Sequence, residues 1–217
     1  AYDASGFVTR RGDHSLTGAA DGRLRSFGPV GSEVGHVVLG YDGLGRPTSR
    51  SVSGVAVLDQ GFRFGGQVTE RTNGDLELDL RFMRLSLSGQ TDVYRHLDRR
   101  GNVKFLTDSE GEVLTHYHYG GWGLTSIDGN GWLDADHRFA QGLDLGKIMI
   151  LGARAYDPAV GRFLSPDPIH QAMNQYTYTP GNPVDLWDPA GLQSRSDSHE
   201  DVVMGVLLGV AVGVGLP

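Results

Sequence analysis

The residues of this chain that could do chemistry are Asp and Arg side chains in a turn-rich stretch near its end. The stretch runs from Gly152 to Leu192, and in it three Asp-Pro pairs stand among Gly, Asn and Ser. These residue types favour tight turns, so we expect compact chain reversals that fix the charged side chains in space. A carboxylate can take a proton from water and a carboxylic acid can give one to a leaving nitrogen, so two close carboxylates can divide these roles.

Three of these side chains carry the chemical interpretation: Arg154, Asp167 and Asp188. An arginine beside carboxylates could hold one of them ionised or polarise a carbonyl group. The alternative is structural, because an Asp before a proline commonly caps a turn and an Arg commonly forms a salt bridge. Asp157 and Arg162, in the same stretch, are interpreted as structural.

The order of residues in this stretch resembles that of a known family. It reads GARAYDPAVGRFLSPDP, then NQYTY, then NP, and it closes on DPAGL. This order resembles the RHS repeat-associated core domain of RHS/YD-repeat proteins, a group that includes polymorphic bacterial toxins and the C component of insecticidal toxin complexes. The match covers the whole stretch, and the segment between Pro168 and Asn174 is shorter than in some members.

The resemblance implies a toxin that cleaves itself. In the family the chain is cut just after the DPxGL motif, which here is the bond between Leu192 and Gln193. The resemblance makes Arg154 and Asp167 the catalytic residues, with Asp188 as the second carboxylate. We expect no cofactor and no metal ion. The chain would be an aspartic-type autoprotease that acts once, in cis, and releases its C-terminal segment. A cut at the acid-labile Asp-Pro bond of the motif would instead be uncatalysed chemistry.

A second class of function stays open beside the autoprotease. The chain could be a non-catalytic β scaffold for surface interaction or carbohydrate binding, or the product of a truncated or orphan RHS gene. Its 217 residues correspond to a radius of gyration of ~17 Å, against ~13 Å for a ~100-residue guest, so one chain cannot enclose a folded guest. We therefore expect the plug end of a larger shell, an orphan piece or a decayed gene.

The elements that must position these side chains are expected to be short antiparallel strands. The chain has 33 glycines in 217 residues, about twice the usual ~7%, which favours many turns. Its front half holds degenerate units in which Asp and Gly form a turn and an apolar residue starts the return strand. These units resemble YD repeats and lie at residues 2–8, 19–24, 41–46, 96–103 and 108–113. The expected fold is mostly β: an antiparallel meander of YD-repeat hairpins that forms part of a curved β-shell and ends in a turn-rich core plug.

One segment alternates strictly between charged and apolar residues. From Asp75 to Phe82 every second residue is apolar, which predicts a strand with one face in water. Met83 breaks the phase, and the alternation then resumes one step shifted, which predicts a bulge near Phe82 and Met83. Strands are also predicted at residues 34–39 and 52–58.

The chain is divided into three parts by these patterns. We expect a degenerate YD-repeat region at residues 1–119, an RHS core at 120–192 and a post-cleavage segment at 193–217. The last part holds an apolar run from Val202 to Leu216 with glycines at four-residue spacing, which as a helix resembles the small-residue stripes of membrane helices. Its fifteen residues at ~1.5 Å each are too short for a ~30 Å hydrocarbon core. A membrane-contacting peptide and the start of a truncated toxin region are the two interpretations, and the second is preferred.

Histidines and tryptophans offer two further sites, and packing is the preferred interpretation of both. The histidines that could bind a metal are His96, His116, His118 and His137. His116 and His118 would share one face of a strand, but cross-strand pairing explains this spacing without a metal. Trp122 and Trp132 could form a platform for a sugar.

Charge and composition narrow the partners. The formal charge of −7 gives no basic footprint, which predicts no nucleic-acid partner. The absence of cysteine excludes disulfides and thiolate chemistry. No signal peptide is visible, and a chain that starts at Ala1 is interpreted as part of a longer reading frame. The resemblance implies a secreted or cell-surface bacterial protein whose partners are the rest of an RHS shell or upstream polypeptide, its own C-terminal segment, and an immunity protein or carbohydrate.

Overall fold

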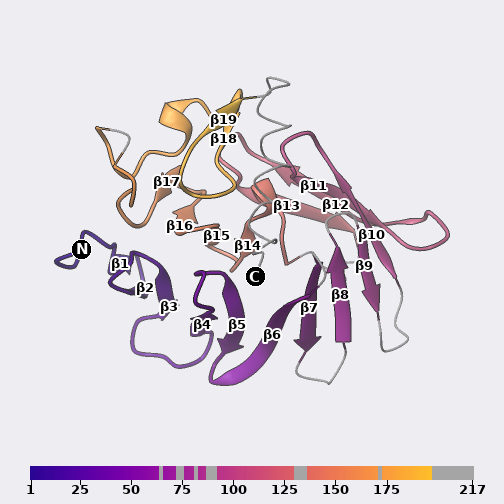
Figure 1. The fold of residues 1–217 in the computed structure, drawn as a ribbon, viewed down its shortest axis with the longest axis horizontal. Helices are drawn as coiled ribbons and strands as arrows, with labels where there is room; N and C mark the ends of the chain where they lie inside the picture. The colour runs from indigo at the N-terminus through magenta and orange to yellow at the C-terminus, as the bar shows by residue number, and fades with distance from the viewer. Residues whose placement is uncertain are drawn as a thin grey trace, which may run out of the picture.

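The computed structural model describes residues 1–63, 66–71, 76–80, 83–86, 92–129, 136–170 and 173–196. Within these residues the chain forms three antiparallel β-sheets and two short 3-10 turns (Figure 1). The two turns are η1 (Phe139–Gln141) and η2 (Thr179–Gly181). The expectation of a mostly β, antiparallel fold is therefore confirmed.

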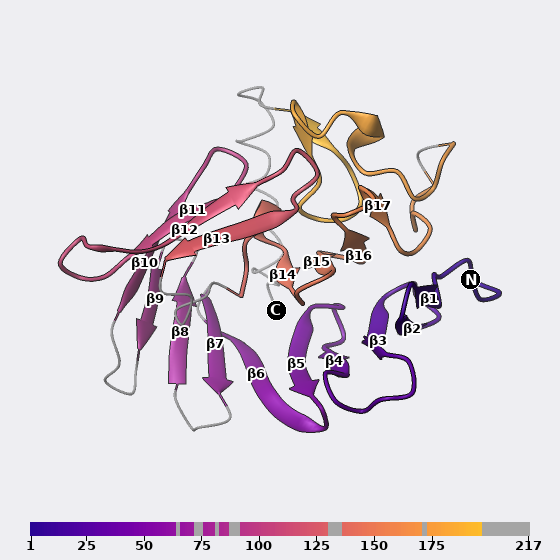
Figure 2. The same ribbon diagram turned by 180° about the vertical axis from the view of Figure 1, so that it is seen from behind.

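The first sheet is a long meander. Its thirteen strands lie side by side in the order in which they occur along the chain. They are β1 (Arg10–Arg11), β2 (His14–Gly18), β3 (Leu24–Pro29), β4 (Val37–Tyr41), β5 (Pro47–Val52), β6 (Val55–Arg63), β7 (Gly66–Arg71), β8 (Leu76–Leu80), β9 (Met83–Ser86), β10 (Val93–Leu97), β11 (Val103–Thr107), β12 (Val113–Tyr119) and β13 (Thr125–Gly129). Figures 1 and 2 show that these strands follow a curve, with β14–β17 on its inner side.

The repeat units are built on one kind of five-residue turn. The N–H of the first residue donates to the carbonyl of the fifth, and the N–H of the fourth donates to the carbonyl of the first, at six places in the described chain. Four of these turns begin with Asp3, Asp42, Asp98 and Asp108, whose Oδ1 accepts the N–H groups of the third and fifth residues. The fourth residue is a glycine with φ between 77° and 87° in each. The four units thus share an Asp whose carboxylate satisfies the turn amides.

The turn at Ala19 shows what happens when this Asp is missing. Its two backbone hydrogen bonds are the same as in the other turns, at 2.8 and 2.9 Å. Asp21 supplies a carboxylate from within the turn, and its Oδ1 accepts the N–H of Arg23 at 3.1 Å. The unit at residues 19–24 therefore keeps the geometry of the repeat without its first side chain.

The alternating segment consists of two strands rather than one. β8 and β9 pair antiparallel, with Leu80 opposite Met83. The chain therefore reverses between Leu80 and Met83, so the bulge expected near Phe82 and Met83 is wrong; Phe82 itself lies outside the described residues. A tight turn and a bulge both shift an alternating pattern by one step, so the pattern could not distinguish them.

Two of the other expected strands begin later than expected. β4 starts at Val37, and β6 starts at Val55. Ser53 and Gly54 have φ values of 54° and 77°, so they form the turn between β5 and β6. The expected strand at 52–58 therefore includes the end of one strand, a turn and the start of the next.

The second and third sheets form the later core. The second contains β14 (Leu143–Asp144), β15 (Met149–Leu151), β16 (Arg154–Asp157) and β17 (Arg162–Phe163), and the third contains β18 (Leu186–Trp187) and β19 (Arg195–Ser196). One apolar cluster joins strands of the first sheet to the second; it includes Phe7, Leu16, Leu24, Phe27, Val37, Leu39, Leu143, Ile148, Ile150, Ala155 and Leu164. A second, aromatic cluster lies within the later core and includes Phe139, Tyr156, Phe163, Tyr178 and Trp187. Burial of these side chains fixes β16 and the chain around it.

An ion pair also ties the start of the chain to the later core. Arg11 in β1 donates to both carboxyl oxygens of Asp157, and its Nη2 lies 2.9 Å from Oδ1. Asp157 is 1% exposed, and its Oδ1 also accepts the N–H of Ala159 at 3.0 Å. These contacts fit the structural interpretation of Asp157.

Some expectations concern residues outside the described part of the chain. They are the apolar run from Val202 to Leu216 and the side chain of Trp132. Among the described residues, no helix has the length and apolar character needed to cross a bilayer. The division of the chain after residues 119 and 192 stays a prediction.

Candidate self-cleavage site

The bond expected to be cut lies in the loop between β18 and β19. These two strands pair antiparallel, so both ends of the loop are fixed. Asp188 follows β18 directly and is 2% exposed. Its Oδ1 accepts the backbone N–H of Leu192 at 3.1 Å and that of Gln193 at 3.2 Å. These contacts cap the turn after β18, as the structural interpretation expects, and they also bring the carboxyl group of Asp188 to 3.2 Å from the nitrogen of the Leu192–Gln193 bond.

Arg154 holds the chain on the other side of this bond. It begins β16 and is 3% exposed. Its Nε donates to the carbonyl of Gly191 at 2.5 Å, its Nη1 to the carbonyl of Gln175 at 3.1 Å, and its Nη2 to Oδ2 of Asp188 at 3.5 Å. The guanidinium carbon lies 3.5 Å from the centre of the Phe163 ring. One side chain thus contacts both the DPAGL segment and its carboxylate.

Two glycines allow the backbones of the GAR and DPAGL motifs to cross. Gly152 has φ of 49° and Gly191 has φ of 62°. A Cβ on Gly152 would lie 2.2 Å from the carbonyl oxygen of Ala190, and one on Gly191 would lie 2.2 Å from that of Leu151. The N–H of Ala153 donates to the carbonyl of Ala190 at 2.9 Å. The motifs need glycine here because any side chain would separate the two segments.

Asp167 lies near Arg154 but does not contact the bond. It is 5% exposed, and its Oδ1 accepts the N–H of Ile169 at 3.1 Å. This contact caps the turn after SPDP, as the structural interpretation expects. Among its described contacts none joins Asp167 to Leu192 or Gln193. Its negative charge acts on the guanidinium of Arg154 and favours the charged form.

The electrostatics of the site follow from its burial. Burial lowers the pKa of Arg154, and the charges of Asp167 and Asp188 act in the opposite direction. Burial raises the pKa of Asp188 above that of a free aspartate, and the hydrogen bond from Leu192 and the charge of Arg154 offset only part of this rise. A larger fraction of Asp188 is therefore protonated than for an exposed Asp at the same pH.

Three residues of the site did not emerge from the sequence reasoning. Phe163 stacks on the guanidinium of Arg154, Gln175 supplies a carbonyl to it, and Tyr178 accepts the N–H of Asp188 at 3.3 Å. All three lie within the quoted motifs. The uncharged residues of these motifs could therefore have been considered as parts of the site alongside the charged ones.

His116 and His118 share one face of β12, as their spacing predicted, whereas His137 is half-buried and bridges to Leu143. His116 and His118 both point outward from β12, and Nε2 of His118 lies 3.0 Å from Oδ2 of Asp128. His96 stacks on Phe105, with 4.2 Å between the ring centres. Within the described ranges, no three His, Cys, Asp or Glu side chains are grouped so that they could hold a metal ion.

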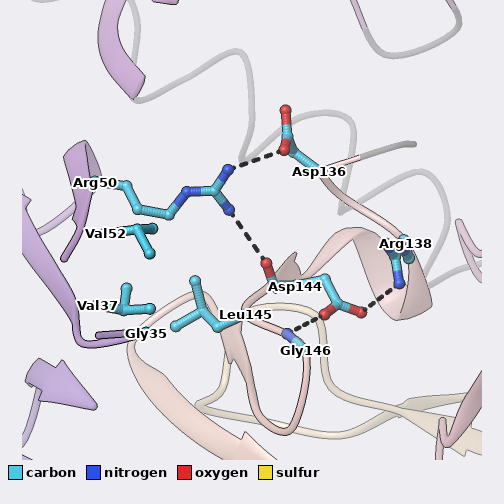
Figure 3. A pocket seen from close by; sticks show the side chains of 9 residues that line it. All are labelled: Gly35, Val37, Arg50, Val52, Asp136, Arg138, Asp144, Leu145 and Gly146. Atoms are coloured by element: carbon cyan, nitrogen blue, oxygen red, sulfur yellow. Dashed lines mark hydrogen bonds and ion pairs between the residues drawn. The ribbon is translucent and has the colours of Figure 1, made fainter. Parts of the chain in front are cut away.

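A pocket of about 450 Å³ lies between the first sheet and the later core (Figure 3). Arg50 reaches across it to Oδ1 of Asp136 at 3.3 Å and to the carbonyl of Asp144 at 3.4 Å. Arg138 pairs with Oδ2 of Asp144 at 3.2 Å, and burial raises the pKa of Asp144. The lining charges are therefore already paired, and none of the lining residues belongs to the self-cleavage site.

Comparison with known proteins gives relatives but no matching family model. The chain is 26% identical over 215 residues to the tRNA3(Ser)-specific nuclease WapA of Bacillus spizizenii, covering 88% of this chain and 9% of that protein. It is 37% identical over 105 residues to the double-stranded DNA deaminase toxin A of Burkholderia cenocepacia, covering 45% of this chain and 7% of the toxin. Its fold matches a crystal structure of TcdB2-TccC3 without the hypervariable C-terminal region, with a TM-score of 0.69 and 20% identity, over 88% of this chain and 11% of the other.

The names of the two relatives count against the expectation that nucleic acid is no partner. That expectation came from the net charge, and this chain spans less than a tenth of either relative. Net charge over so small a part says nothing about what the remainder contacts. The relatives and the shared fold are consistent with the RHS-type toxin family that the motifs of this chain resemble.

Proposed function

We propose that this chain is the C-terminal core portion of an RHS-type toxin and that it cuts itself once, in cis, between Leu192 and Gln193. One observation carries the proposal: the buried carboxyl group of Asp188 accepts hydrogen bonds from the N–H of Leu192 and from that of Gln193, whose nitrogen belongs to the bond. The description of one protein of similar fold names a hypervariable C-terminal region, which fits a chain whose C-terminal segment is released. The reaction is hydrolysis, in which water adds to the Leu192 carbonyl carbon, the C–N bond breaks, and a new carboxylate and a new amine form.

Asp188 acts as the general acid in this proposal. When water adds to the carbonyl carbon, the nitrogen of Gln193 becomes tetrahedral and gains a lone pair that can receive a proton. A carboxylic acid at 3.2 Å from this nitrogen is within reach to supply it. The raised pKa of Asp188 supports this role, because it increases the protonated fraction.

Arg154 orients the bond and stabilises negative charge. Its hydrogen bond to the Gly191 carbonyl fixes the residue directly before Leu192. Negative charge develops on the Leu192 oxygen as water adds, and a buried guanidinium one peptide away favours that charge. Proximity of this kind accounts for large rate effects, because the reacting groups need no further ordering.

Asp167 is the proposed general base. Its Oδ1 accepts the N–H of Ile169, and its Oδ2 accepts no hydrogen bond from a described residue, which leaves that oxygen for water. Asp167 and Asp188 both interact with the charge of Arg154, which supports the idea that the two carboxylates serve one site. Asp167 would then take a proton from the attacking water.

The chain's partners follow from the same proposal. The rest of an RHS shell is the main partner, and the segment after Leu192 is the product. We place the whole protein outside the producing cell or on its surface. An immunity protein and a carbohydrate stay as proposed partners of that whole protein.

Mass spectrometry of the purified chain tests this function. The unmutated chain should yield a fragment that starts at Gln193, whereas Asp167→Asn and Asp188→Asn should leave the chain intact. Asp185→Asn is the matched control, because Asp185 lies in the same segment and is exposed. Its carboxylate accepts a hydrogen bond from the Asn182 side chain, and its backbone N–H donates to the oxygen of that same side chain. An intact unmutated chain at neutral pH, or a fragment that starts at Pro189, would end the proposal.

A further inference from the structure

We infer that Tyr178 is a positioning residue of the self-cleavage site, because its hydroxyl holds the backbone of the residue that carries the acid. The inference rests on the proposed function. It assigns a role to a tyrosine whose hydroxyl bonds the main chain of Asp188 and acts on the Leu192–Gln193 bond only through that residue.

The ring of Tyr178 is held rigidly. It is 0% exposed, and its centre lies 4.6 Å from that of Tyr156, 5.8 Å from that of Phe163 and 6.2 Å from that of Phe139. Close packing on several sides prevents the ring from swinging away. The phenolic oxygen is therefore a fixed point in the core.

This fixed point holds Asp188 by its main chain. The N–H of Asp188 donates to the Tyr178 oxygen at 3.3 Å, so a buried amide that would otherwise lack an acceptor is satisfied. The side chain of the same residue reaches Leu192 and Gln193 at 3.1 and 3.2 Å. A small shift of the Asp188 backbone would lengthen both contacts, since the carboxyl group is attached only one carbon away from it.

Tyr156 provides a matched control within the same aromatic cluster. It is also 0% exposed, and its ring contacts that of Tyr178. Its hydroxyl donates to the carbonyl of Trp122 at 2.9 Å and not to Asp188. Tyr156→Phe and Tyr178→Phe therefore each remove one buried hydroxyl and keep the ring, and only the second removes a contact to the site.

The experiment compares self-cleavage of the full 217-residue chain and its variants. Each protein is prepared in denaturant, refolded by dilution into buffers from acidic to mildly alkaline pH, and sampled over time for the fragment of residues 193–217. Circular dichroism and thermal unfolding confirm that both variants fold. We expect Tyr178→Phe to slow cleavage about tenfold, the effect of losing one hydrogen bond that holds a reacting group. Tyr156→Phe should leave the rate within about twofold, because the hydrogen bond of Tyr156 does not hold a reacting group.

The pH profile separates positioning from a general loss of stability. The hydrogen bonds from Leu192 and Gln193 lower the pKa of Asp188, so a backbone shift that lengthens them raises this pKa further. The falling limb of the profile should therefore move to higher pH in Tyr178→Phe and stay in place in Tyr156→Phe. Arg154, which contacts Asp188, is retained in both variants.

The possible outcomes are distinct. Equal slowing in the two variants, or an unmoved limb in Tyr178→Phe, would overturn the role of Tyr178 while self-cleavage itself stands. An unmutated chain that stays intact at every pH would overturn the proposed function and this inference together.

Discussion

Replacing Gly191 by alanine tests whether the crossing of the two motifs sets up the reaction. The added Cβ would lie 2.2 Å from the carbonyl oxygen of Leu151 and 3.0 Å from the nitrogen of Arg154. Both are backbone atoms, so the chain must move by about 1 Å to reach an ordinary contact. The residue also keeps φ of 62°, which costs about 1 kcal/mol for any residue with a side chain.

Such a movement would disconnect the arginine from the cleavage segment. The Nε of Arg154 lies 2.5 Å from the Gly191 carbonyl, and a shift of about 1 Å lengthens this contact past the usual range of a strong hydrogen bond, about 2.7–3.2 Å. A misplacement of about 1 Å in a reacting site costs about a hundredfold in rate. We therefore expect Gly191→Ala to slow release of residues 193–217 at least that much.

Gly181→Ala is the matched control for this substitution. Gly181 has φ of 82°, and a Cβ there would meet nothing within 4 Å. The control variant therefore has the same backbone strain without the clash. The assay follows the released fragment by mass spectrometry, with thermal unfolding of both variants alongside. If Gly191→Ala cleaves as fast as Gly181→Ala, the crossing does not position the bond.

Three further results are expected from the structure. Gln193→Pro should abolish cleavage, measured by fragment mass. The N–H of Gln193 donates to Asp188 at 3.2 Å, and proline has no N–H to replace it. Arg11→Ala should lower the free energy of unfolding by roughly 3 kcal/mol in urea titrations, because it leaves the buried carboxylate of Asp157 without its cation. Because the pKa of Asp188 is raised, the folded state binds a proton more tightly than the unfolded state. The free energy of unfolding should therefore fall as the pH rises from 3.8, the pKa in the unfolded state, toward the higher pKa in the folded state. Asp188→Asn should remove this part of the fall.

Each of these results has its own control. Gln193→Ala keeps the N–H and should cleave normally; equal rates for the alanine and proline variants would contradict the role of that hydrogen bond. Arg10→Ala removes an exposed neighbour in the same strand, whose Nε contacts only the carbonyl of Gly12, and should change stability little. Denaturant titrations at a series of pH values give the change of the free energy of unfolding with pH. If this change is the same with and without the carboxyl group of Asp188, the proton linkage is ruled out.

The repeat turns illustrate what local sequence can predict. In the four repeat units that begin with Asp, an Asp followed three residues later by Gly forms the turn, because both the carboxylate contacts and the positive φ arise within five residues. Asp42 and Asp108 show the same hydrogen bonds although their neighbours differ. The same local logic failed where two explanations share one pattern, as at Met83, where a chain reversal was taken for a bulge.

The residue types of the site and the bond expected to be cut came from the sequence alone, because the motifs place Arg154, Asp167 and Asp188 in a short turn-rich stretch. Their relative positions came only from the tertiary structure. Contacts from Arg154 to Gly191 and Asp188 join residues 37 and 34 positions apart, and such contacts depend on how buried strands and two glycines pack. Packing brought the carboxyl group of Asp188 to the nitrogen of the Leu192–Gln193 bond and Asp167 near the guanidinium of Arg154. Burial and the crossing of backbones act between segments far apart in the sequence, so no local pattern predicts their result.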